Sequence, residues 1–383
     1  MPFPDLSDEL HALDAQGLLR QRRILETAQG AHVKVDGQDY LSFCSNDYLG
    51  LAAHPRLMEA ACRGVEQYGV GAGASHLIVG HSAAHHQLEL ALAAFLDQPQ
   101  ALLFSTGYMA NLGIVSALLG RNDVVLADKL NHASLNDAAV LSRAKFLRYR
   151  HADLQHLEQL LQGAQGRRKL VVSDAVFSMD GDLAPVPELL ALCERYDAYL
   201  LLDDAHGFGV LGAQGRGILE HFHIQSPRII YMATLGKAAG VFGAFVAGNA
   251  TLMQTLIQSA RTYIYTTAMP PQLAIALLAS LDLFREEAWR RQQLRTLITD
   301  LKAQLQAKRW QLLASDTPIQ ALIIGGNQEA LALAEALRTA GILVPAIRPP
   351  TVPKGQARLR ISLSAAHTQE DVRRLCATLN AMK

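Results

Sequence analysis

The segment AYLLLDDA, residues 198–205, joins an apolar run to two acidic residues. Such a run, closed by polar residues, is typical of a strand buried on both faces of a sheet. Five other runs have the same form: ALLFST (101–106), DVVLAD (123–128), KLVVSD (169–174), IIYMAT (229–234) and GAFVAG (243–248). Stretches with helical periodicity, such as the leucines at 154, 157, 160 and 161, lie between most of them. The alternation predicts an α/β domain around a mostly parallel central sheet.

The pattern changes between residues 270 and 310, where apolar residues line one face of a long helix that we expect to connect two domains. Beyond it, PIQALIIG (318–325), a helix near 328–340, GILVPAI (341–347), ARLRISL (357–363) and a last helix predict a small α+β domain. We therefore predict an N-terminal segment over 1–44, a large domain over 45–284 and a smaller C-terminal α+β domain over 285–383.

Composition excludes several classes of protein. The 383 residues include 35 basic and 35 acidic side chains, so no net charge attracts nucleic acid or an anionic membrane. The four cysteines lie far apart and form no CxxC pair, which argues against a zinc ribbon or a disulfide framework and fits a reducing cytosol. The mixed, acidic start MPFPDLSDELHALDAQG is no secretory signal. The uncharged run 238–260 contains amide and hydroxyl side chains, so we expect a soluble core there and a cytoplasmic protein.

Reactive side chains follow four of the predicted strands. These are Ser105–Tyr108, Ser173–Asp174, Asp203–His206 and Thr234–Lys237. Ligands of open α/β sheets bind at the carboxyl ends of the strands. We therefore expect two acids, a histidine and a lysine to meet at one edge of the sheet.

Lys237, in ATLGKAAGVFG (233–243), is the only charged residue between Arg228 and Arg261. Apolar surroundings disfavour the ammonium form, and the neutral amine is the form that attacks a carbonyl carbon. The alternative is a surface lysine whose stem covers apolar area. A phosphate-binding loop does not fit, because Tyr231 stands where the first glycine belongs.

The sequence also contains the other groups that an aldehyde cofactor such as pyridoxal 5'-phosphate (PLP) requires. That cofactor needs a lysine for its Schiff base and an acid that faces its ring nitrogen. Asp203 suits the acid and His206 could reach the ring hydroxyl, although two acids before a histidine also occur in ordinary turns. STGYMAN (105–111) begins a helix after a strand, where backbone amides bind phosphate or are simply capped.

Two other motifs are weaker. GVGAGASH (69–76) follows a helical pattern and not a strand, so a nicotinamide-dependent dehydrogenase is not favoured. His81 and His85 have the spacing of two metal ligands on one helix face. No third ligand is apparent, so we expect a packed or solvated helix and no metal.

Together these residues resemble the α-oxoamine synthases, a family of fold-type-I PLP enzymes. The resemblance covers nearly the whole chain in order, and its length and RPPTVP element are most similar to members that condense L-alanine with a pimeloyl thioester in biotin biosynthesis. Relatives that use glycine share nearly all of the motifs. The motifs are SNDYLGL (45–51), LNHASL (130–135), VFSMDGD (176–182), DDAHGFGVLG (203–212), AQGRG (213–217), TLGK (234–237) and RPPTVPKGQARLRIS (348–362).

The resemblance implies roles around the cofactor. Lys237 would hold PLP and later move the α-proton of alanine, and Asp203 would pair with the ring nitrogen. His132 would stack on the ring, although a helix-capping or core histidine is the plainer interpretation. The remaining cofactor contacts would be made near the ring hydroxyl by His206 and Ser178, and near the phosphate by Gly107, Tyr108 and Thr234.

The resemblance also implies substrate and partner contacts. Arg360 would bind the amino-acid carboxylate, although a solvated strand arginine is the alternative. Three further residues would contact substrate: Asn46, Thr351 and Arg20, for which Arg22 is an alternative. Thr266 and Thr267 would reach the phosphate in the partner subunit of a homodimer. The acyl carrier would be coenzyme A or a carrier protein. A plain aminotransferase would share Lys237 and Asp203 but release no thiol.

Overall fold

The computed structural model describes residues 6–306 and 309–382, which form two compact units. The larger unit comprises Leu51–Ser178 and Leu183–Trp289. The smaller unit comprises Met1–Gly50, Met179–Asp182 and Arg290–Lys383, so the two ends of the chain belong to the same unit.

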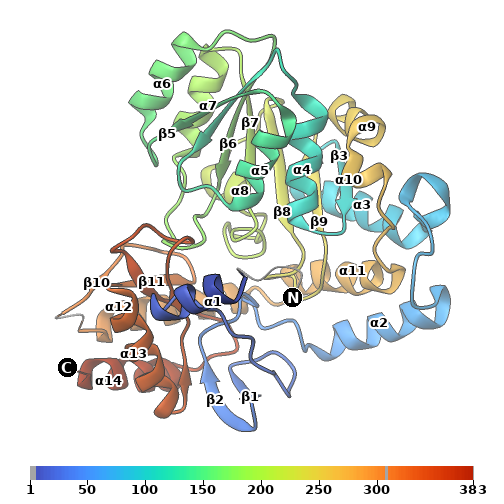
Figure 1. The fold of residues 1–383 in the computed structure, drawn as a ribbon. Coiled ribbons are helices and arrows are strands. Elements are labelled where there is room, and N and C mark those ends of the chain that lie inside the picture. Colours follow the sequence, from blue (N-terminus) through green and yellow to red (C-terminus); the bar gives the residue numbers. More distant parts are fainter. Residues whose placement is uncertain (1–5, 307–308, 383) are drawn as a thin grey trace. The chain divides into compact units, whose positions relative to one another are not determined.

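The larger unit is built on a seven-stranded sheet with the order β3-β9-β8-β7-β6-β4-β5 (Figure 1). Only β9 runs antiparallel to its neighbours, which confirms the predicted mostly parallel sheet. β5 was not among the predicted strands, because it is half-exposed at the edge and lacks a continuous apolar run. The strands are β3 (Gln100–Phe104), β4 (Val124–Asp128), β5 (Lys145–Tyr149), β6 (Lys169–Asp174), β7 (Tyr199–Asp203), β8 (Ile229–Thr234) and β9 (Ala244–Gly248).

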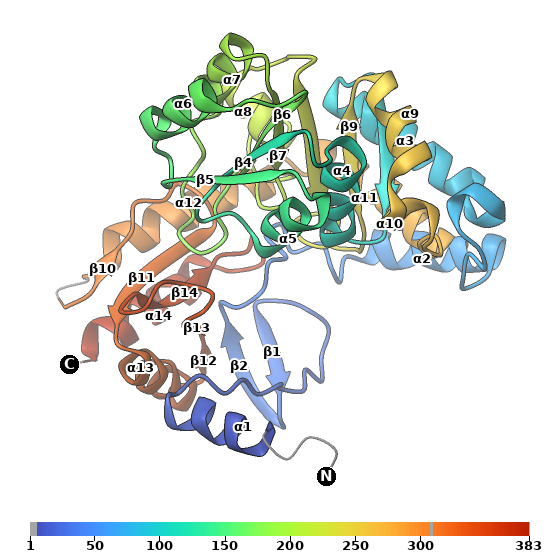
Figure 2. The same cartoon turned by 45° about the horizontal axis from the view of Figure 1, so that its top comes forward.

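Helices cover both faces of this sheet, with α4 and α5 on one side and α6 and α7 on the other (Figures 1 and 2). GVGAGASH follows a helix, α2, as expected from the sequence. The helices of the larger unit are α2 (Pro55–Tyr68), the π-helix η1 (His76–Gly80), α3 (Ala83–Leu96), α4 (Gly107–Leu118), α5 (Ala133–Ser142), α6 (Leu154–Gly163), α7 (Val186–Arg195), α8 (Ile218–Phe222), α9 (Ala250–Ser259), α10 (Arg261–Ile264) and α11 (Pro271–Glu286).

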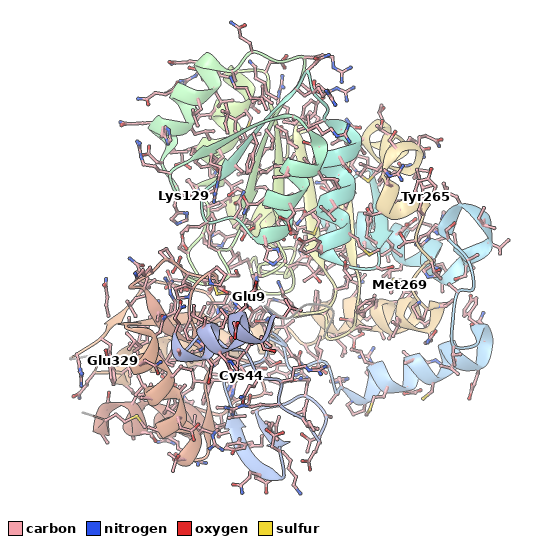
Figure 3. The ribbon with its side chains drawn as sticks, in the orientation of Figure 1. Glu9, Cys44, Lys129, Tyr265, Met269 and Glu329 are labelled. Carbon is pink, nitrogen blue, oxygen red and sulfur yellow. The ribbon has the colours of Figure 1, made fainter. Side chains whose placement is uncertain are left out.

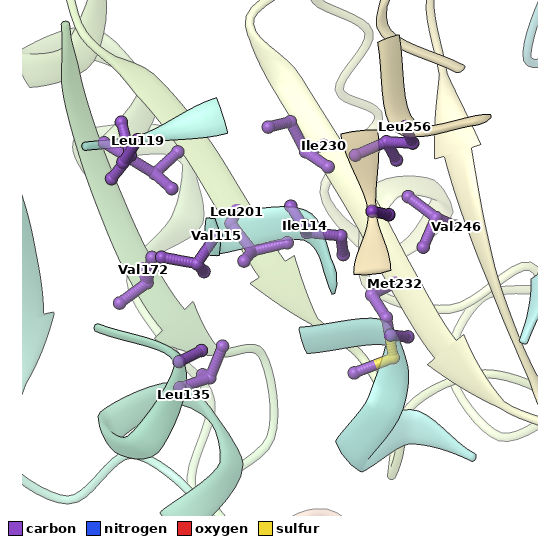
Figure 4. Packing of buried hydrophobic residues seen from close by; sticks show 14 of the residues in the cluster. Ile114, Val115, Leu119, Leu135, Val172, Leu201, Ile230, Met232, Val246 and Leu256 are labelled. Atoms are coloured by element: carbon purple, nitrogen blue, oxygen red, sulfur yellow. The ribbon is translucent and has the colours of Figure 1, made fainter. Parts of the chain in front are cut away.

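The main core of the larger unit lies between the sheet and helices α4, α5 and α9. Because successive strand residues point to opposite faces, Val172 packs toward α4 while Val171 is buried on the other face. Loss of a buried leucine such as Leu201 would cost about 2–5 kcal/mol of stability. Figure 4 labels the core residues Ile114, Val115, Leu119, Leu135, Val172, Leu201, Ile230, Met232, Val246 and Leu256.

The smaller unit contains two small sheets. An antiparallel sheet has the order β10-β11-β14-β13, and in a second sheet β12 pairs in parallel with β2 of the β1–β2 hairpin. Its elements are α1 (Leu6–Ala15), β1 (His32–Val35), β2 (Gln38–Ser42), α12 (Trp289–Gln304), β10 (Gln311–Leu312), β11 (Ile319–Gly325), α13 (Asn327–Thr339), β12 (Ile342–Leu343), β13 (Ala346–Ile347), β14 (Ala357–Ser362) and α14 (Gln369–Ala381).

The long connecting helix is instead two helices, α11 and α12, separated at residues 287–288. Leu281 is buried in α11 and Leu294 in α12. Glu287 has φ −110° and ψ 46°, a backbone conformation outside the helical range, so α11 ends there and α12 begins as a new helix.

The uncharged run 238–260 is divided among a loop, β9 and α9. Within residues 6–306 and 309–382, the structure contains no helix with the length and apolar character that crossing a bilayer requires.

Candidate active site

The predicted strand-end residues line one pocket of about 220 Å³ in the larger unit. In the sheet, Asp174 at the end of β6 pairs with Asp203 at the end of β7, so the two acids are neighbours. All eight residues predicted around the cofactor lie in the lining, which consists of Gly107, Tyr108, His132, Ser134, Asp174, Val176, Ser178, Asp203, Ala205, His206, Met232, Thr234 and Lys237.

Lys237 lies on a closed loop after β8. The amide of Leu235 donates to the carbonyl of Gly243 at 2.8 Å, and the amide of Gly240 donates to the carbonyl of Lys237 at 2.8 Å. Gly240 has a φ of +73°, and a Cβ at this position would lie 2.7 Å from the carbonyl carbon of Leu51, so the loop requires glycine there. The loop holds the amine in place: Nζ of Lys237 lies 2.9 Å from Nε2 of His206.

Asp203 is a buried carboxylate held by two donors. Its Oδ1 accepts from the amide of Ala205 at 3.1 Å, and its Oδ2 accepts from Nδ2 of Asn111 at 2.8 Å. The same Nδ2 also donates to Oγ of Ser134 at 2.9 Å. The sequence interpretation assigned no role to Asn111, although it ends the STGYMAN motif, four residues after Gly107 and therefore on the same face of α4.

Asp204, the second acid of the pair, has a different place. Its Oδ2 accepts from the hydroxyl of Tyr231 and from the amide of Ile218, both at 2.7 Å. Burial raises the pKa of Asp204 to about 7. Asp204 therefore joins β7, β8 and the start of α8, and only Asp203 lines the pocket.

His132 is both a helix cap and a pocket residue. Its Nδ1 caps α5 by accepting from the amide of Ser134 at 3.3 Å, and it lies 2.7 Å from Oγ of Ser134. The ring meets Tyr108 edge to face, with 6.4 Å between the ring centroids. Burial lowers the pKa of His132, while the charge of Asp203 acts in the opposite direction. A neutral ring can stack on a flat aromatic ligand without a charge to desolvate.

Asp174 holds the backbone of His132 in place through hydrogen bonds. Both of its carboxylate oxygens lie 3.2 Å from the backbone nitrogen of His132, which donates to them. Burial raises the pKa of Asp174 well above its usual range, and the neighbouring charge of Asp203 adds to this effect.

Helix α4 begins at the pocket. Oγ1 of Thr106 caps it by accepting from the amide of Met109 at 3.1 Å, while Gly107 and Tyr108 line the pocket. The first amides of a helix carry a partial positive charge and bind anions well. Thr234 also lines the pocket, and its hydroxyl donates to the carbonyl of Gly243 at 3.0 Å. This end of the pocket suits a phosphate group.

The predicted substrate residues belong to the smaller unit. Arg360 is buried, and its guanidinium donates to Oδ1 of Asn46 at 3.1 Å and to the hydroxyl of Tyr48 at 3.3 Å. The buried position rules out the solvated strand arginine considered above. Thr351 lies in an exposed turn, and Arg20 and Arg22 are also exposed.

A model of the family described as aminotransferase class I and II matches residues 38–379. The chain belongs to this family. Two curated members to which it is similar are the 8-amino-7-oxononanoate synthases of Nitrosospira multiformis (64% identity over 374 residues; 98% of this chain and 94% of the relative) and Nitrosomonas eutropha (62% over 381 residues; 99% and 98%).

Two solved structures are also similar to this chain over most of its length. A serine palmitoyltransferase from S. paucimobilis with a bound PLP–myriocin aldimine matches with a TM-score of 0.93 and 29% identity, over 99% of this chain and 97% of that one. The 8-amino-7-oxononanoate synthase from Francisella tularensis matches with a TM-score of 0.77 and 33% identity, over 89% and 96%. The fold-type-I assignment and the resemblance to α-oxoamine synthases are confirmed.

Proposed function

We propose that this chain is an 8-amino-7-oxononanoate synthase. It condenses L-alanine with a pimeloyl thioester and releases carbon dioxide and the free thiol carrier, as a step of biotin biosynthesis. One observation carries the proposal: the amine of Lys237, 2.9 Å from His206, shares a pocket with the buried carboxylate of Asp203. Relatives with this activity in their names are 62–64% identical over nearly the whole chain.

The pocket fits PLP, the cofactor of this enzyme. The aldehyde requires an amine, the ring nitrogen a carboxylate and the phosphate a set of backbone amides, and the described residues supply all three within one lining. When bound, PLP supplies an aldehyde that reacts with amines and a protonated ring that accepts electrons from the substrate carbon.

Asp203 and His132 act on the ring. Asp203 holds a proton on the ring nitrogen, because a buried carboxylate stabilises the positive charge beside it. Asn111 keeps the carboxylate oriented through its 2.8 Å hydrogen bond. His132, whose pKa is lowered by burial, would stack on the ring. His206 and Ser178 would hold the ring hydroxyl, and Gly107, Tyr108 and Thr234 would hold the phosphate.

Lys237 acts twice. Its amine would hold the aldehyde of the cofactor and would become available as a base once the amine of alanine has replaced it. The free amine lies beside His206 and removes the α-proton of alanine, a transfer that a positioned base accelerates by about 10²–10⁴-fold. After the acyl group has been transferred and carbon dioxide has left, the same amine returns the proton to the substrate carbon.

Arg360 binds the carboxylate of alanine. Asn46, Tyr48 and Ser362 accept hydrogen bonds from its guanidinium and orient it, and a fixed guanidinium can bind a carboxylate through two parallel hydrogen bonds. Arg20 and Thr351 contact the acyl substrate, and Arg22 is the alternative to Arg20. The thioester carrier is coenzyme A or an acyl carrier protein.

The active enzyme is a cytoplasmic homodimer in which Thr266 and Thr267 reach the partner's phosphate. Two features support the dimer. The π-helix η1 exposes Ile78 by 73% and Val79 by 81%, and Tyr265, labelled in Figure 3, is 70% exposed beside Thr266. Exposed apolar side chains that lie together are typical of protein interfaces. Sedimentation equilibrium of the purified protein should give twice the chain mass of 41.6 kDa.

The activity is tested with purified holoenzyme, L-alanine and pimeloyl-CoA. We expect equal amounts of free thiol, carbon dioxide and a product with the mass of 8-amino-7-oxononanoate. Faster turnover of glycine with acetyl-CoA would reassign the chain to glycine C-acetyltransferase or another α-oxoamine synthase. Exchange of amino groups with oxo-acids, without thiol release, would identify a plain aminotransferase.

A further inference from the structure

The segment 76–89 carries four histidines, of which His81 and His85 have the spacing of two ligands on one helix face. His85 is packed within the fold: its Nε2 lies 2.7 Å from the carbonyl of Met269 (labelled in Figure 3), and its Nδ1 lies 2.9 Å from Oγ of Ser82. Both ring nitrogens of His85 are thus engaged within the fold. His81 precedes helix α3 and is not part of it, so helical spacing does not govern which residues it meets.

The ring of His81 stacks on that of His85, with 5.8 Å between the ring centroids, but its ligand partners are His86 and Glu89. These two residues are three positions apart on α3 and therefore share one face of the helix. One ligand atom from each of the three residues lies within 4.8 Å of the others, and Nε2 of His81 is 3.8 Å from Oε2 of Glu89. His86 is exposed, so its ring can rotate to bring its nitrogen closer.

The other polar atoms of the cluster are already held in place. Nδ1 of His81 lies 3.0 Å from Nδ1 of His76, and Oε1 of Glu89 accepts from the amide of Leu103 at 2.9 Å. His76 in turn stacks on Tyr263, with 4.8 Å between the ring centroids. Metal-binding histidines and carboxylates are commonly oriented through such hydrogen bonds at their second polar atom. Here these contacts leave Nε2 of His81 and Oε2 of Glu89 directed toward each other.

We propose that His81, His86 and Glu89 form a zinc site outside the active site. Two imidazoles and one carboxylate match the ligand preference of Zn²⁺, whereas Mg²⁺ and Ca²⁺ prefer oxygen ligands alone. Zinc bonds of about 2.0–2.2 Å require the ligand atoms to move together by roughly 1 Å from the widest separation in the structure. A water molecule completes the coordination. Glu89 ties the site to β3, so the ion stabilises the fold and takes no part in the reaction.

The site is tested by equilibrium dialysis of tag-free holoenzyme against Zn²⁺, with bound metal measured by elemental analysis and thermal unfolding measured in parallel. We expect one Zn²⁺ per chain and a higher Tm with zinc than with a chelator. His81→Ala and His86→Ala should each weaken binding at least tenfold and abolish the rise in Tm. Glu89→Gln should also weaken binding while keeping an acceptor for the amide of Leu103.

Matched controls separate this site from others. His11→Ala, which removes an exposed histidine of α1, should bind zinc as the wild type does. Because His86 is exposed, His86→Ala should retain the fold and the visible absorbance of the holoenzyme. Zinc binding that is equal in His86→Ala and in wild type, or an absence of zinc binding by the wild type, would overturn the proposal. Neither result would bear on the proposed synthase activity, which is tested by a separate assay.

Discussion

Asp203 and Asp204 are adjacent buried acids, but only Asp203 lines the pocket, so substitutions at the two positions test the role of the pocket carboxylate. Asp203→Asn removes one charge from the pocket but keeps an oxygen that can accept from Nδ2 of Asn111, so the local fold should persist. The lost charge is the buried partner of the protonated ring. Removal of one member of a buried ion pair costs about 3–5 kcal/mol, which corresponds to a loss of roughly 150- to 5,000-fold in kcat.

Asp204→Asn is the matched control. Asp204 is equally buried and one residue away, but it hydrogen-bonds to Tyr231 and Ile218 and does not line the pocket. The assay follows release of coenzyme A with a thiol reagent at saturating L-alanine and pimeloyl-CoA. Activity is expressed per folded molecule, determined by near-UV circular dichroism. We expect kcat of Asp204→Asn to stay within about threefold of the wild type. Equal losses in the two variants would refute the role given to Asp203.

Three further predictions test other parts of the structure. Arg360→Lys should raise KM for alanine by roughly 10- to 100-fold, because one charge-assisted hydrogen bond is worth about 1.5–3 kcal/mol, and Arg338→Lys on the surface should leave KM unchanged in steady-state kinetics. The pKa of Asp204 is about 7 in the folded protein, against an ordinary value of 3.8. Between these two pH values the folded state therefore binds a proton that the unfolded state has lost. The free energy of unfolding of the wild type consequently falls as the pH rises from about 4 to 7. Urea unfolding of Asp204→Asn should therefore show a stability that increases relative to wild type by at most about 1.4 kcal/mol per pH unit in this range, and a pH-independent difference would contradict the assignment. Gly240→Ala should lower the free energy of unfolding by about 2–4 kcal/mol, because a left-handed residue would place its Cβ against Leu51, and urea titration should detect this.

The central sheet was predictable because strands buried on both faces of a parallel sheet must be apolar throughout. Strand β5 escaped prediction because its edge position leaves it half-exposed and its sequence mixed. The break between α11 and α12 also escaped prediction, since residues 287–288 contain neither glycine nor proline to mark the end of a helix.

The sequence predicts which strand ends form the pocket, but it does not predict which side chains hydrogen-bond to one another there. The period of a strand implies that Asp203 and Asp204 point to opposite faces, yet which of them lines the pocket depends on tertiary packing. Asn111 hydrogen-bonds to Asp203 because α4 packs beside the end of β7, and no local sequence pattern predicts that packing. Similarly, the spacing of His81 and His85 does not show that both ring nitrogens of His85 are engaged by Ser82 and Met269. This engagement leaves His86 and Glu89 as the ligand groups beside His81.

Covalent attachment at Lys237 is the most direct test of the whole account. The holoenzyme is treated with borohydride, digested and mapped by mass spectrometry. The account predicts a reduced pyridoxyl phosphate on the peptide that contains residue 237, loss of the yellow colour, and a colourless Lys237→Ala protein. A label on another lysine, or a Lys237→Ala protein as yellow as the wild type, would contradict the proposed chemistry.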